Sequence, residues 1–350
     1  MSQWRDNIRR VEPYVPGEQP KEKNVIKLNT NENPYGPSPR VQMVKENMDD
    51  LRLYPDPTAG ALVDALAEYH GVNPDQVFVG VGSDDVLSMA FLTFFNAKKP
   101  IRFPDITYSF YDVWAELYRI PYEQPALDEN FKIRREDYYG ENGGVVFPNP
   151  NAPTGIAEDL EFVEDIISHN PDVVVIVDEA YVDFGGTSAL SLIDKYENLL
   201  VVRTFSKSRS MAGLRIGYAI GQPELIRALN DVKYSFNSYT MNRPSLLLGV
   251  ESIRDEAYFR ETVAGIIRTR EQFGEEMKKL GFTFPESKAN FIFATHKTAK
   301  AKDIFEAAKK RGIYVRYFNK PRIDNYLRIT IGKPEEMETL LKFLKEYLSE

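Results

Sequence analysis

The feature that most constrains the fold of this chain is a series of short apolar segments between residues 77 and 204. The segments QVFVGVG, GGVVFPNP, DVVVIVDEAY and NLLVVRTFS are almost continuously apolar, and a helical pattern separates each from the next. Strands that are apolar on both faces and alternate with helices are typical of a mostly parallel sheet covered on both sides. We therefore expect an α/β fold in which ligands bind beyond the carboxyl ends of the strands.

The parts of the chain outside this alternation predict an arm and a second, smaller unit. Residues 1–57 are rich in Pro, Asn and Gly, with Tyr and Leu between them that can dock on a surface. After a long amphipathic helix near 254–280, the tail reads as a small α+β unit. Because 350 residues exceed what one compact core usually holds, we expect an N-terminal arm over 1–36, a large domain over 37–250 and a small domain over 251–350.

Composition excludes several kinds of chemistry and partner. The chain has no cysteine, and its three histidines are scattered, so we expect no metal site and no thiolate or histidine nucleophile. A net charge of −8 without a long basic block argues against nucleic acid as a partner. No segment reaches the roughly 18 apolar residues of a membrane span, and the start of the chain has no apolar core. We therefore expect a cytoplasmic protein that binds no membrane.

Two strand ends carry the strongest catalytic candidates. Asp178 follows the apolar run 173–177, where a carboxylate is costly to bury unless a cation or a donor meets it. Lys207 follows the next strand, about one crossover unit later, so the two residues should meet at the same edge of the sheet. A lysine held away from bulk water can form a Schiff base with an aldehyde. Read singly, however, Asp178 could be a helix cap or half of an ion pair, and Lys207 a solvated surface lysine.

Groups that could bind a phosphate surround Lys207 and a glycine turn. In VGVGSDDV, the backbone N–H groups of Gly82, Ser83 and Asp84 open a helix where an anion could bind, provided that the Asp84 carboxylate points away. The same segment could equally be a simple helix cap. Further candidate phosphate ligands lie around the lysine, namely Thr204, Ser206 and one of Arg203, Arg209 and Arg215.

Three other side chains could contact an aromatic ring bound between these groups. Tyr181 could present its phenol to the ring, and Asn151, in the rigid loop PNPNAPTG, could hold its amide against a ring hydroxyl. Tyr108 could stack on the ring. The simpler interpretations are a stiff turn for the loop and a core position for Tyr108.

Taken in order, nine motifs of the chain resemble those of the fold-type I aminotransferases, which use pyridoxal phosphate. The pattern is most similar to the histidinol-phosphate aminotransferase family and covers nearly the whole chain. The nine motifs are NENPYGP, YPDP, GSDD, TYSFY, PNAPTG, VDEAYVDF, RTFSKSRSMAGLRIGY, FNSY and YLRITIG. The resemblance implies a large domain with a mostly parallel seven-stranded sheet between helices and a smaller α+β domain.

The resemblance also implies roles around the cofactor. Lys207 would carry the pyridoxal phosphate as a Schiff base and move a proton, while Asp178 would keep the pyridine nitrogen protonated. Tyr181 and Asn151 would bind the ring oxygen O3′, and Tyr108 would cover the ring face. The residues implied to hold the cofactor phosphate are Gly82, Ser83, Asp84, Thr204, Ser206 and Arg215.

Partner and substrate follow from the same resemblance. Tyr54 would reach the phosphate in a neighbouring subunit, which implies a homodimer with shared sites, and the arm would pack against the small domain and the partner. Arg316 and Arg328 would hold the phosphate of the substrate. The other implied substrate-binding residues are Tyr14, Asn33 and Asn237. The implied reaction moves an amino group between L-histidinol phosphate and 2-oxoglutarate, giving imidazole-acetol phosphate and L-glutamate, in histidine biosynthesis.

One departure from the pattern and three alternatives stay open. Ala152 stands where the pattern has an Asn before PTG, so either Asn151 or another group must supply the amide to O3′. The alternatives are a decarboxylase of a phosphorylated amino acid such as threonine phosphate, an aromatic amino acid aminotransferase, and a cofactor-sensing regulatory domain. The last would need a DNA-binding module, for which the 57-residue arm has neither room nor charge.

Overall fold

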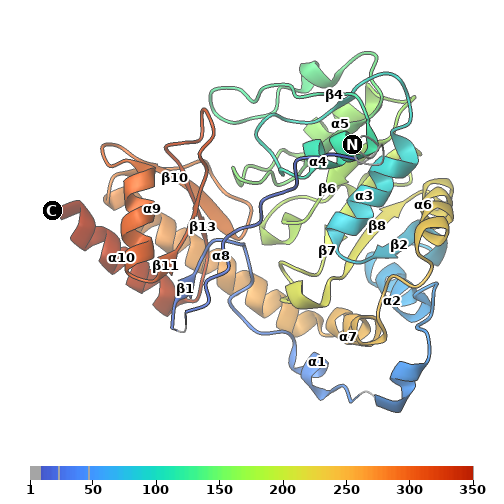
Figure 1. Cartoon of the computed structure of the whole chain (residues 1–350), viewed down its shortest axis with the longest axis horizontal. Helices are drawn as coiled ribbons and strands as arrows, with labels where there is room; N and C mark the ends of the chain where they lie inside the picture. The colour runs from blue at the N-terminus through green and yellow to red at the C-terminus, as the bar shows by residue number, and fades with distance from the viewer. Residues whose placement is uncertain (1–8, 23, 46–47, 350) are drawn as a thin grey trace, which may run out of the picture.

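The computed structural model describes residues 9–22, 24–45 and 48–349. A seven-stranded sheet dominates the larger part of the molecule, with the strand order β2-β8-β7-β6-β5-β3-β4 (Figure 1). Neighbouring strands are parallel except at β8, which is antiparallel to both β2 and β7. In chain order these strands are β2 (Val77–Gly80), β3 (Ile101–Arg102), β4 (Tyr122–Glu123), β5 (Val145–Pro148), β6 (Val175–Asp178), β7 (Leu199–Thr204) and β8 (Gly217–Gly221). The expected α/β fold with a mostly parallel sheet is confirmed.

Helices cover both faces of this sheet, which is why its strands are apolar throughout. Side chains that alternate along each strand enter two separate cores, as Val175 and Val177 do on one face and Ile176 on the other. The first core is closed by α2 (Gly60–His70), α5 (Leu160–Ser168) and α7 (Arg243–Arg254). The second core is closed by α3 (Ser83–Phe94), α4 (Tyr111–Tyr118) and α6 (Pro223–Phe236).

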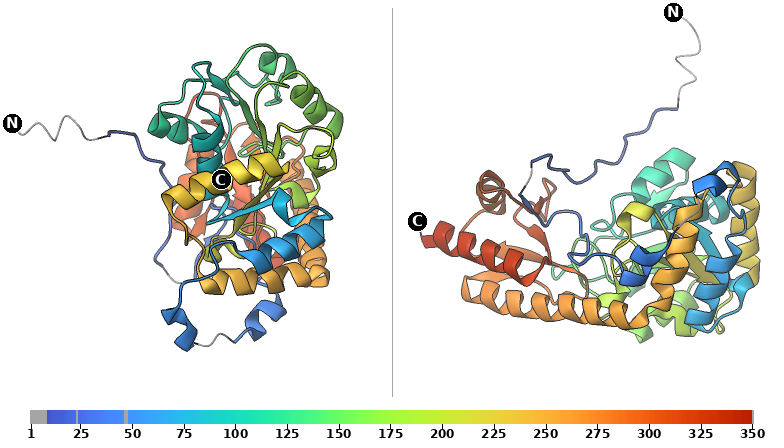
Figure 2. Two further views of the ribbon diagram at one scale, coloured as in Figure 1. Left: turned by 90° about the vertical axis from the view of Figure 1, so that its right-hand side faces the viewer. Right: turned by 90° about the horizontal axis from the view of Figure 1, so that it is seen from below.

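A smaller α+β unit forms the other end of the molecule. Its sheet has the order β12-β13-β10-β9 and is antiparallel throughout. The strands are β9 (Phe282–Thr283), β10 (Phe291–His296), β12 (Arg316–Tyr317) and β13 (Leu327–Thr330). The helices are α8 (Glu256–Lys279), α9 (Ala301–Lys310) and α10 (Pro334–Ser349). Figure 2 shows α8 as the long helix that extends from the large unit along the small one.

The N-terminal arm joins the two units. In the arm, before α1 (Pro39–Met43), strand β1 (Ile26–Lys27) pairs in parallel with β11 (Ile313–Tyr314) of the small unit. Leu28 enters the core of that unit. Residues 29–33 then run past the carboxyl edge of the large sheet, where Thr30 and Asn33 form hydrogen bonds with Lys207. We retain the division into 1–36, 37–250 and 251–350 as a proposal, in which the second boundary falls inside α7.

The α-helix expected between the segments DVVVIVDEAY and NLLVVRTFS does not form. The segment near 188–197 forms only a short 3₁₀ turn (Ala189–Leu192). Its start is anchored to a strand end, because the Glu179 carboxylate accepts hydrogen bonds from Ser188 Oγ (2.7 Å) and from the Ala189 N–H (2.6 Å). Among the described helices, none is long and apolar enough to cross a lipid bilayer.

Candidate active site

The carboxyl ends of three strands and the start of a fourth define the candidate site. Asp178 at the end of β6 pairs in register with Pro148 of β5 and Val202 of β7. The antiparallel β8 begins where β2 and β7 end, so Gly217 lies between Gly80 and Thr204. The loop that carries Lys207 and the glycine turn after β2 therefore converge on one edge of the sheet.

Asp178 is buried and held by two donors. Its Oδ2 accepts a hydrogen bond from the Tyr111 hydroxyl (2.8 Å) and its Oδ1 from the Ala180 N–H (3.1 Å). Burial raises the pKa of this carboxyl to about 6, with smaller upward contributions from the nearby Asp84 and Glu179 charges, and the two hydrogen bonds oppose the rise. The site therefore holds an acid that is ionised at neutral pH but lacks a cationic partner within the described residues.

The Lys207 amine lies at the junction of the large sheet and the arm. Its Nζ donates to the Thr30 carbonyl (3.2 Å) and lies 5.7 Å from the centroid of the Tyr181 ring. Asn33 fixes the lysine backbone, because its Nδ2 donates to the carbonyls of Lys207 and Ser208, both at 3.1 Å. The polar groups of Asn33 are thus used on backbone atoms, and the structure places it as a support for the lysine loop.

The glycine turn forms a cradle that only glycine fits. Gly82 has φ 85°, and a Cβ on it would lie 2.5 Å from Arg215 Nη2. A Cβ on Gly217 would lie 2.2 Å from the carbonyl carbon of Gly82, so the absence of a side chain allows these two backbone segments to touch. The Gly82 N–H donates to the Gly80 carbonyl (3.0 Å) and is not available to a ligand. The N–H groups of Ser83 and Asp84, in the first turn of α3, remain available.

The side chains of Asp84 and Asp85, which follow this turn, point in different directions. Asp85 folds back and accepts from the Val81 N–H (2.9 Å), as expected for a first-turn acid. Asp84 instead accepts from the Tyr108 hydroxyl (2.7 Å) and pairs with Arg215 (2.9 Å). The expectation that the Asp84 side chain points away from the site is therefore wrong, because two groups of the site bind it.

Of the three arginines around Lys207, only Arg215 lies at the glycine turn. Arg203 is buried in an ion pair with Glu179 (2.9 Å). Arg209 is buried as well, where it donates to the Ser252 carbonyl (2.7 Å) and stacks on the ring of Phe259 (4.2 Å). Both are therefore structural, which leaves Arg215 as the candidate phosphate ligand.

Two hydroxyls stand beside Arg215. The Thr204 hydroxyl donates to the Ile216 carbonyl (3.3 Å) and accepts from the Ser206 N–H (3.1 Å). The Ser206 hydroxyl has no hydrogen-bond partner within the part of the chain that the structure describes. It is thus the freer of the two expected hydroxyl ligands.

Both polar atoms of the Asn151 side-chain amide are hydrogen-bonded to other residues of the protein. Its Nδ2 donates to the Ile106 carbonyl (3.0 Å) and to Thr154 Oγ1 (3.1 Å), and its Oδ1 accepts from Thr107 (3.0 Å). The amide thereby fixes two loops to each other, and its hydrogen-bonding groups are not free to bind a ring oxygen. With Ala152 as its neighbour, the loop 148–155 supplies no free amide to the site.

Two arginines of the small unit face each other, and no acid of the described residues forms an ion pair with either of them. Arg316 and Arg328 are direct partners in the register of β12 and β13. Arg328 donates to the Asn29 carbonyl (3.1 Å), while its buried Nε has no partner among the described residues. Burial lowers the pKa of Arg328 from its usual value, and the charge of Arg316 adds to this lowering. Like charges opposite each other destabilise a sheet, and such a pair suits a bound anion.

The arm closes one side of the arginine pair. Tyr14 stacks on Phe110, with ring centroids 4.1 Å apart, and lies near Arg316 and Arg328. A recess of about 1000 Å³ opens here and is lined by Tyr14, Thr107 and Arg316 among others.

Two expected site residues, Tyr54 and Asn237, lie away from the candidate site of their own chain. Tyr54 is 80% exposed and stacks on Tyr239, with ring centroids 4.6 Å apart. Asn237 ends α6 beside that pair, is exposed, and accepts from the Tyr239 N–H (3.2 Å). Both lie on an outer surface of the large unit.

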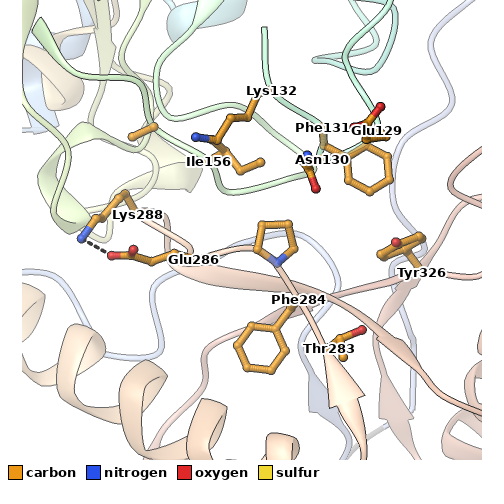
Figure 3. A pocket seen from close by; sticks show the side chains of 12 residues that line it. Glu129, Asn130, Phe131, Lys132, Ile156, Thr283, Phe284, Glu286, Lys288 and Tyr326 are labelled. Atoms are coloured by element: carbon orange, nitrogen blue, oxygen red, sulfur yellow. Dashed lines mark ion pairs between the residues drawn. The ribbon is translucent and has the colours of Figure 1, made fainter.

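A separate cavity of about 530 Å³ lies between the two units and contains none of the expected site residues. It is lined by Lys132 and Phe131 of the large unit and by Phe284 and the Glu286–Lys288 ion pair of the small one (Figure 3). The candidate side chains converge instead at the edge of the large sheet.

Sequence reasoning missed three contributors to the site, namely Thr30, Asn31 and Tyr111. Tyr111 is the first residue of α4 and lies three residues after Tyr108, and its N–H donates to the Tyr108 carbonyl (3.3 Å), so the motif TYSFY could have indicated it. Thr30 acts through its carbonyl, which leaves no signal in its residue type. Asn31 is the first residue of the motif NENPYGP, two positions before the expected Asn33.

Fold and side chains together define a class of enzyme. The chain matches the family described as Aminotransferase class I and II over residues 23–344, and it belongs to that family. Members of this class are transaminases that depend on pyridoxal phosphate.

Relatives narrow the class to one branch. The chain is 53% identical to the histidinol-phosphate aminotransferase of Clostridium botulinum (strain Kyoto / Type A2), over 100% of this chain and 99% of the relative. It is 52% identical to that of Lactococcus lactis subsp. cremoris (strain SK11), over 99% of this chain and 98% of the relative. The crystal structure of histidinol-phosphate aminotransferase from Sinorhizobium meliloti in complex with pyridoxal-5′-phosphate superposes with a TM-score of 0.83 at 25% identity, covering 93% of this chain and 91% of that chain. The chain belongs to the histidinol-phosphate aminotransferases.

The residues present fit pyridoxal phosphate. The glycine cradle at Gly82 and Gly217, the available N–H groups of Ser83 and Asp84, and the free Ser206 hydroxyl suit a phosphate. An ionised and buried Asp178 suits a protonated ring nitrogen. The Lys207 amine, held only by a backbone carbonyl, suits an aldehyde.

Proposed function

We propose that this chain transfers an amino group between L-histidinol phosphate and 2-oxoglutarate in histidine biosynthesis. The class of enzyme and the branch of the family support the reaction. The observation that carries the choice of substrate is the facing pair Arg316 and Arg328, which lies beside the candidate site without an acidic partner in the described residues. A phosphate dianion is the kind of group that two adjacent guanidinium groups bind well.

The chain's own residues have distinct proposed roles. Lys207 Nζ would take the proton from the substrate carbon that bears the amino group and later return it. Asp178 would hold the ring nitrogen protonated, which is why its ionised state matters. Tyr181 would donate to the ring oxygen, and Tyr108 would cover the ring. Pyridoxal phosphate, when bound, supplies an electron sink for the carbanion that loss of this proton creates.

The ligands of the cofactor phosphate belong to the same proposal. The backbone of Ser83 and Asp84, the Ser206 hydroxyl and Arg215 would hold it, with Thr204 as a support. Because Arg215 pairs with Asp84 in this structure, a bound phosphate would have to compete with that carboxylate for the guanidinium.

Both substrates would use the same arginines in turn. Histidinol phosphate would present its phosphate to Arg316 and Arg328, and glutamate or 2-oxoglutarate would present a carboxylate. Tyr14 would close over either anion, since its stacking on Phe110 holds the arm against the recess.

A homodimer with shared sites is a further part of the proposal. Exposed apolar side chains gather around Tyr54, and they include Phe236 at 72% exposure and Tyr239 at 46%. Large aromatic side chains gathered in such a patch are typical of a subunit interface. Tyr54 and Asn237 would then serve the site of the other subunit. We place the enzyme in the cytoplasm, because its substrates are small anions that do not cross membranes unaided.

The test is glutamate formation by the purified protein. Pyridoxal phosphate, 2-oxoglutarate and either L-histidinol phosphate or L-histidinol are supplied, and we expect product only with the phosphorylated amine. Arg328→Ala should raise KM for histidinol phosphate about 10- to 100-fold, because a charge-assisted hydrogen bond is lost. Arg311→Ala, at an exposed arginine of the same unit, is the matched control and should leave KM unchanged.

Two results would contradict the proposal. Equal rates with histidinol would favour an aromatic or broad-range aminotransferase. Consumption of a phosphorylated amino acid with release of carbon dioxide, and without any need for 2-oxoglutarate, would favour the decarboxylase.

A further inference from the structure

Asn31 is a buried asparagine whose polar groups are all bound. It is 1% exposed and has φ 56°, a left-handed conformation that asparagine tolerates better than most residues. Its backbone N–H donates to Thr330 Oγ1 (3.0 Å), and its carbonyl accepts from Asn290 Nδ2 (3.1 Å). Its Oδ1 accepts from Thr330 Oγ1 (2.9 Å), and its Nδ2 donates to the Tyr181 hydroxyl (2.9 Å).

These contacts fix the direction in which the Tyr181 phenol can donate. Thr330 Oγ1 accepts from the Asn31 N–H and donates its own hydrogen to Asn31 Oδ1, while Nδ2 faces the phenol. An amide nitrogen can only donate, so the Tyr181 oxygen must accept there and keep its hydrogen for another acceptor. Within the described residues the Tyr181 hydroxyl has no such acceptor.

The loop that would ordinarily supply an amide to the ring oxygen does not do so here. Asn151 is bound to Ile106, Thr107 and Thr154, and the next residue is Ala152, which is 6% exposed and packs in the same apolar cluster as Tyr181. The phenol is thus the remaining hydrogen-bond donor for that oxygen among the residues expected to bind it.

We infer that Asn31, oriented by Thr330, is the positioning residue that makes Tyr181 a donor to the ring oxygen of the cofactor. The inference rests on the proposed function, in which Tyr181 faces that oxygen. It assigns to the arm and the small unit a task in tuning the cofactor, because Asn31 precedes the large domain and Thr330 ends β13. Thr330 is two residues from Arg328 on the same strand, so one short strand carries both a substrate ligand and the support of the phenol.

The test uses the holoenzyme and follows the visible absorbance of the bound cofactor as a function of pH. A hydrogen bond to the ring oxygen lowers its basicity, so losing the bond should raise the pKa of the absorbance transition. Asn31→Gly removes the amide while keeping the left-handed backbone relaxed, and we expect a rise of about one pKa unit, a tenfold change in proton affinity. Asn31→Asp keeps the shape but turns the donor into an acceptor, so the rise should be larger.

The Tyr181→Phe background is the control that separates positioning from a structural role. If Asn31 acts through the phenol, Asn31→Gly should cause no further shift when Tyr181 is Phe. Thr330→Val, which keeps nearly the same volume, should reproduce part of the shift and serves if the Asn31 variants fold poorly. The dissociation constant of pyridoxal phosphate from the apoprotein, followed by protein fluorescence, should rise about three- to tenfold in Asn31→Gly.

The outcomes are distinguishable from a failure of the proposed function. An unchanged transition in both Asn31→Gly and Thr330→Val, or an equal shift with and without the Tyr181 hydroxyl, would overturn the inference. A wild-type protein that shows the transition but forms no glutamate would refute the proposed function and leave these absorbance comparisons valid, because they need no amino substrate.

Discussion

At the scale of single residues, the buried carboxylate of Asp178 lowers the stability of the protein without its cofactor at neutral pH. Asp178 has only neutral donors around it, Tyr111 and the Ala180 N–H, and burial raises its pKa to about 6. The folded state therefore binds its proton more tightly than the unfolded chain does. Stability from this group is greatest at low pH and falls as the pH rises from about 4 to about 6.

We predict that Asp178→Asn stabilises the apoprotein at neutral pH. The gain should be on the order of 2–3 kcal/mol in the free energy of unfolding at pH 8, because the uncharged amide removes the cost of burying a charge, and the gain should vanish near pH 4. Urea unfolding of the two apoproteins at both pH values measures the difference. The same substitution should weaken pyridoxal phosphate binding and transaminase activity, since the ring nitrogen loses its counter-ion. An apoprotein with unchanged stability at pH 8 would mean that Asp178 is not an uncompensated charge.

The residue scale also shows what the sequence could and could not predict about the site. Asp178 and Lys207 follow apolar runs, and that position alone predicted their meeting at one sheet edge. Asn33 and Asn151 were expected to bind ligands, but an amide bonds to whatever lies nearest in three dimensions, here backbone carbonyls and loop hydroxyls. The partners of such a side chain depend on tertiary packing, which no local pattern encodes.

At the scale of elements, the strands and most helices follow from hydrophobic periodicity, while the direction of β8 does not. The apolar run 217–221 reads like its neighbours, yet β8 returns antiparallel between β2 and β7. The connection 205–216 contains only the short 3₁₀ helix η7 (Ala212–Leu214) and no crossover α-helix. This reversal brings Gly217 against Gly82 and so builds the cradle.

We predict that Gly82→Ala disrupts that cradle. The new Cβ would force a non-glycine residue into φ 85° and would lie 2.5 Å from Arg215 Nη2, so the free energy of unfolding should fall by about 1–3 kcal/mol. Pyridoxal phosphate should also dissociate more readily, because Arg215 must move. Thermal unfolding and cofactor titration measure the two effects. Gly213→Ala, with no atom within 4 Å of its new Cβ, is the matched control and should behave like the wild type.

At the scale of the whole molecule, the exposed aromatic patch around Tyr54 is the surface on which assembly would depend. It combines η2 (Met48–Arg52) and the segment after it with the end of α6, two parts of the chain far apart in sequence. Because this patch contains Tyr54 and Asn237, which were expected in the active site, the proposed assembly would tie the formation of the dimer to activity.

We predict that Phe236→Glu shifts the protein toward monomers. Phe236 is 72% exposed, so the substitution should leave the fold intact while placing a charge in an apolar contact. Sedimentation velocity at micromolar concentration measures the assembly, and the specific activity should fall with it. Phe236→Tyr keeps the ring and should remain assembled like the wild type. A wild-type protein that sediments as a monomer would refute the proposed homodimer directly.

The pairing of β1 with β11 sets when during its synthesis the enzyme can become competent. Thr30, whose carbonyl accepts from Lys207, and Asn31, whose amide donates to Tyr181, lie just after β1. The strand that pairs with β1 follows almost 300 residues later in the chain. A growing chain can begin to build the large sheet early, but it cannot dock this early segment until residues 313–314 have been made. The arm contacts of Lys207 and Tyr181 can therefore reach their final geometry only after β11 has been made and has paired with β1.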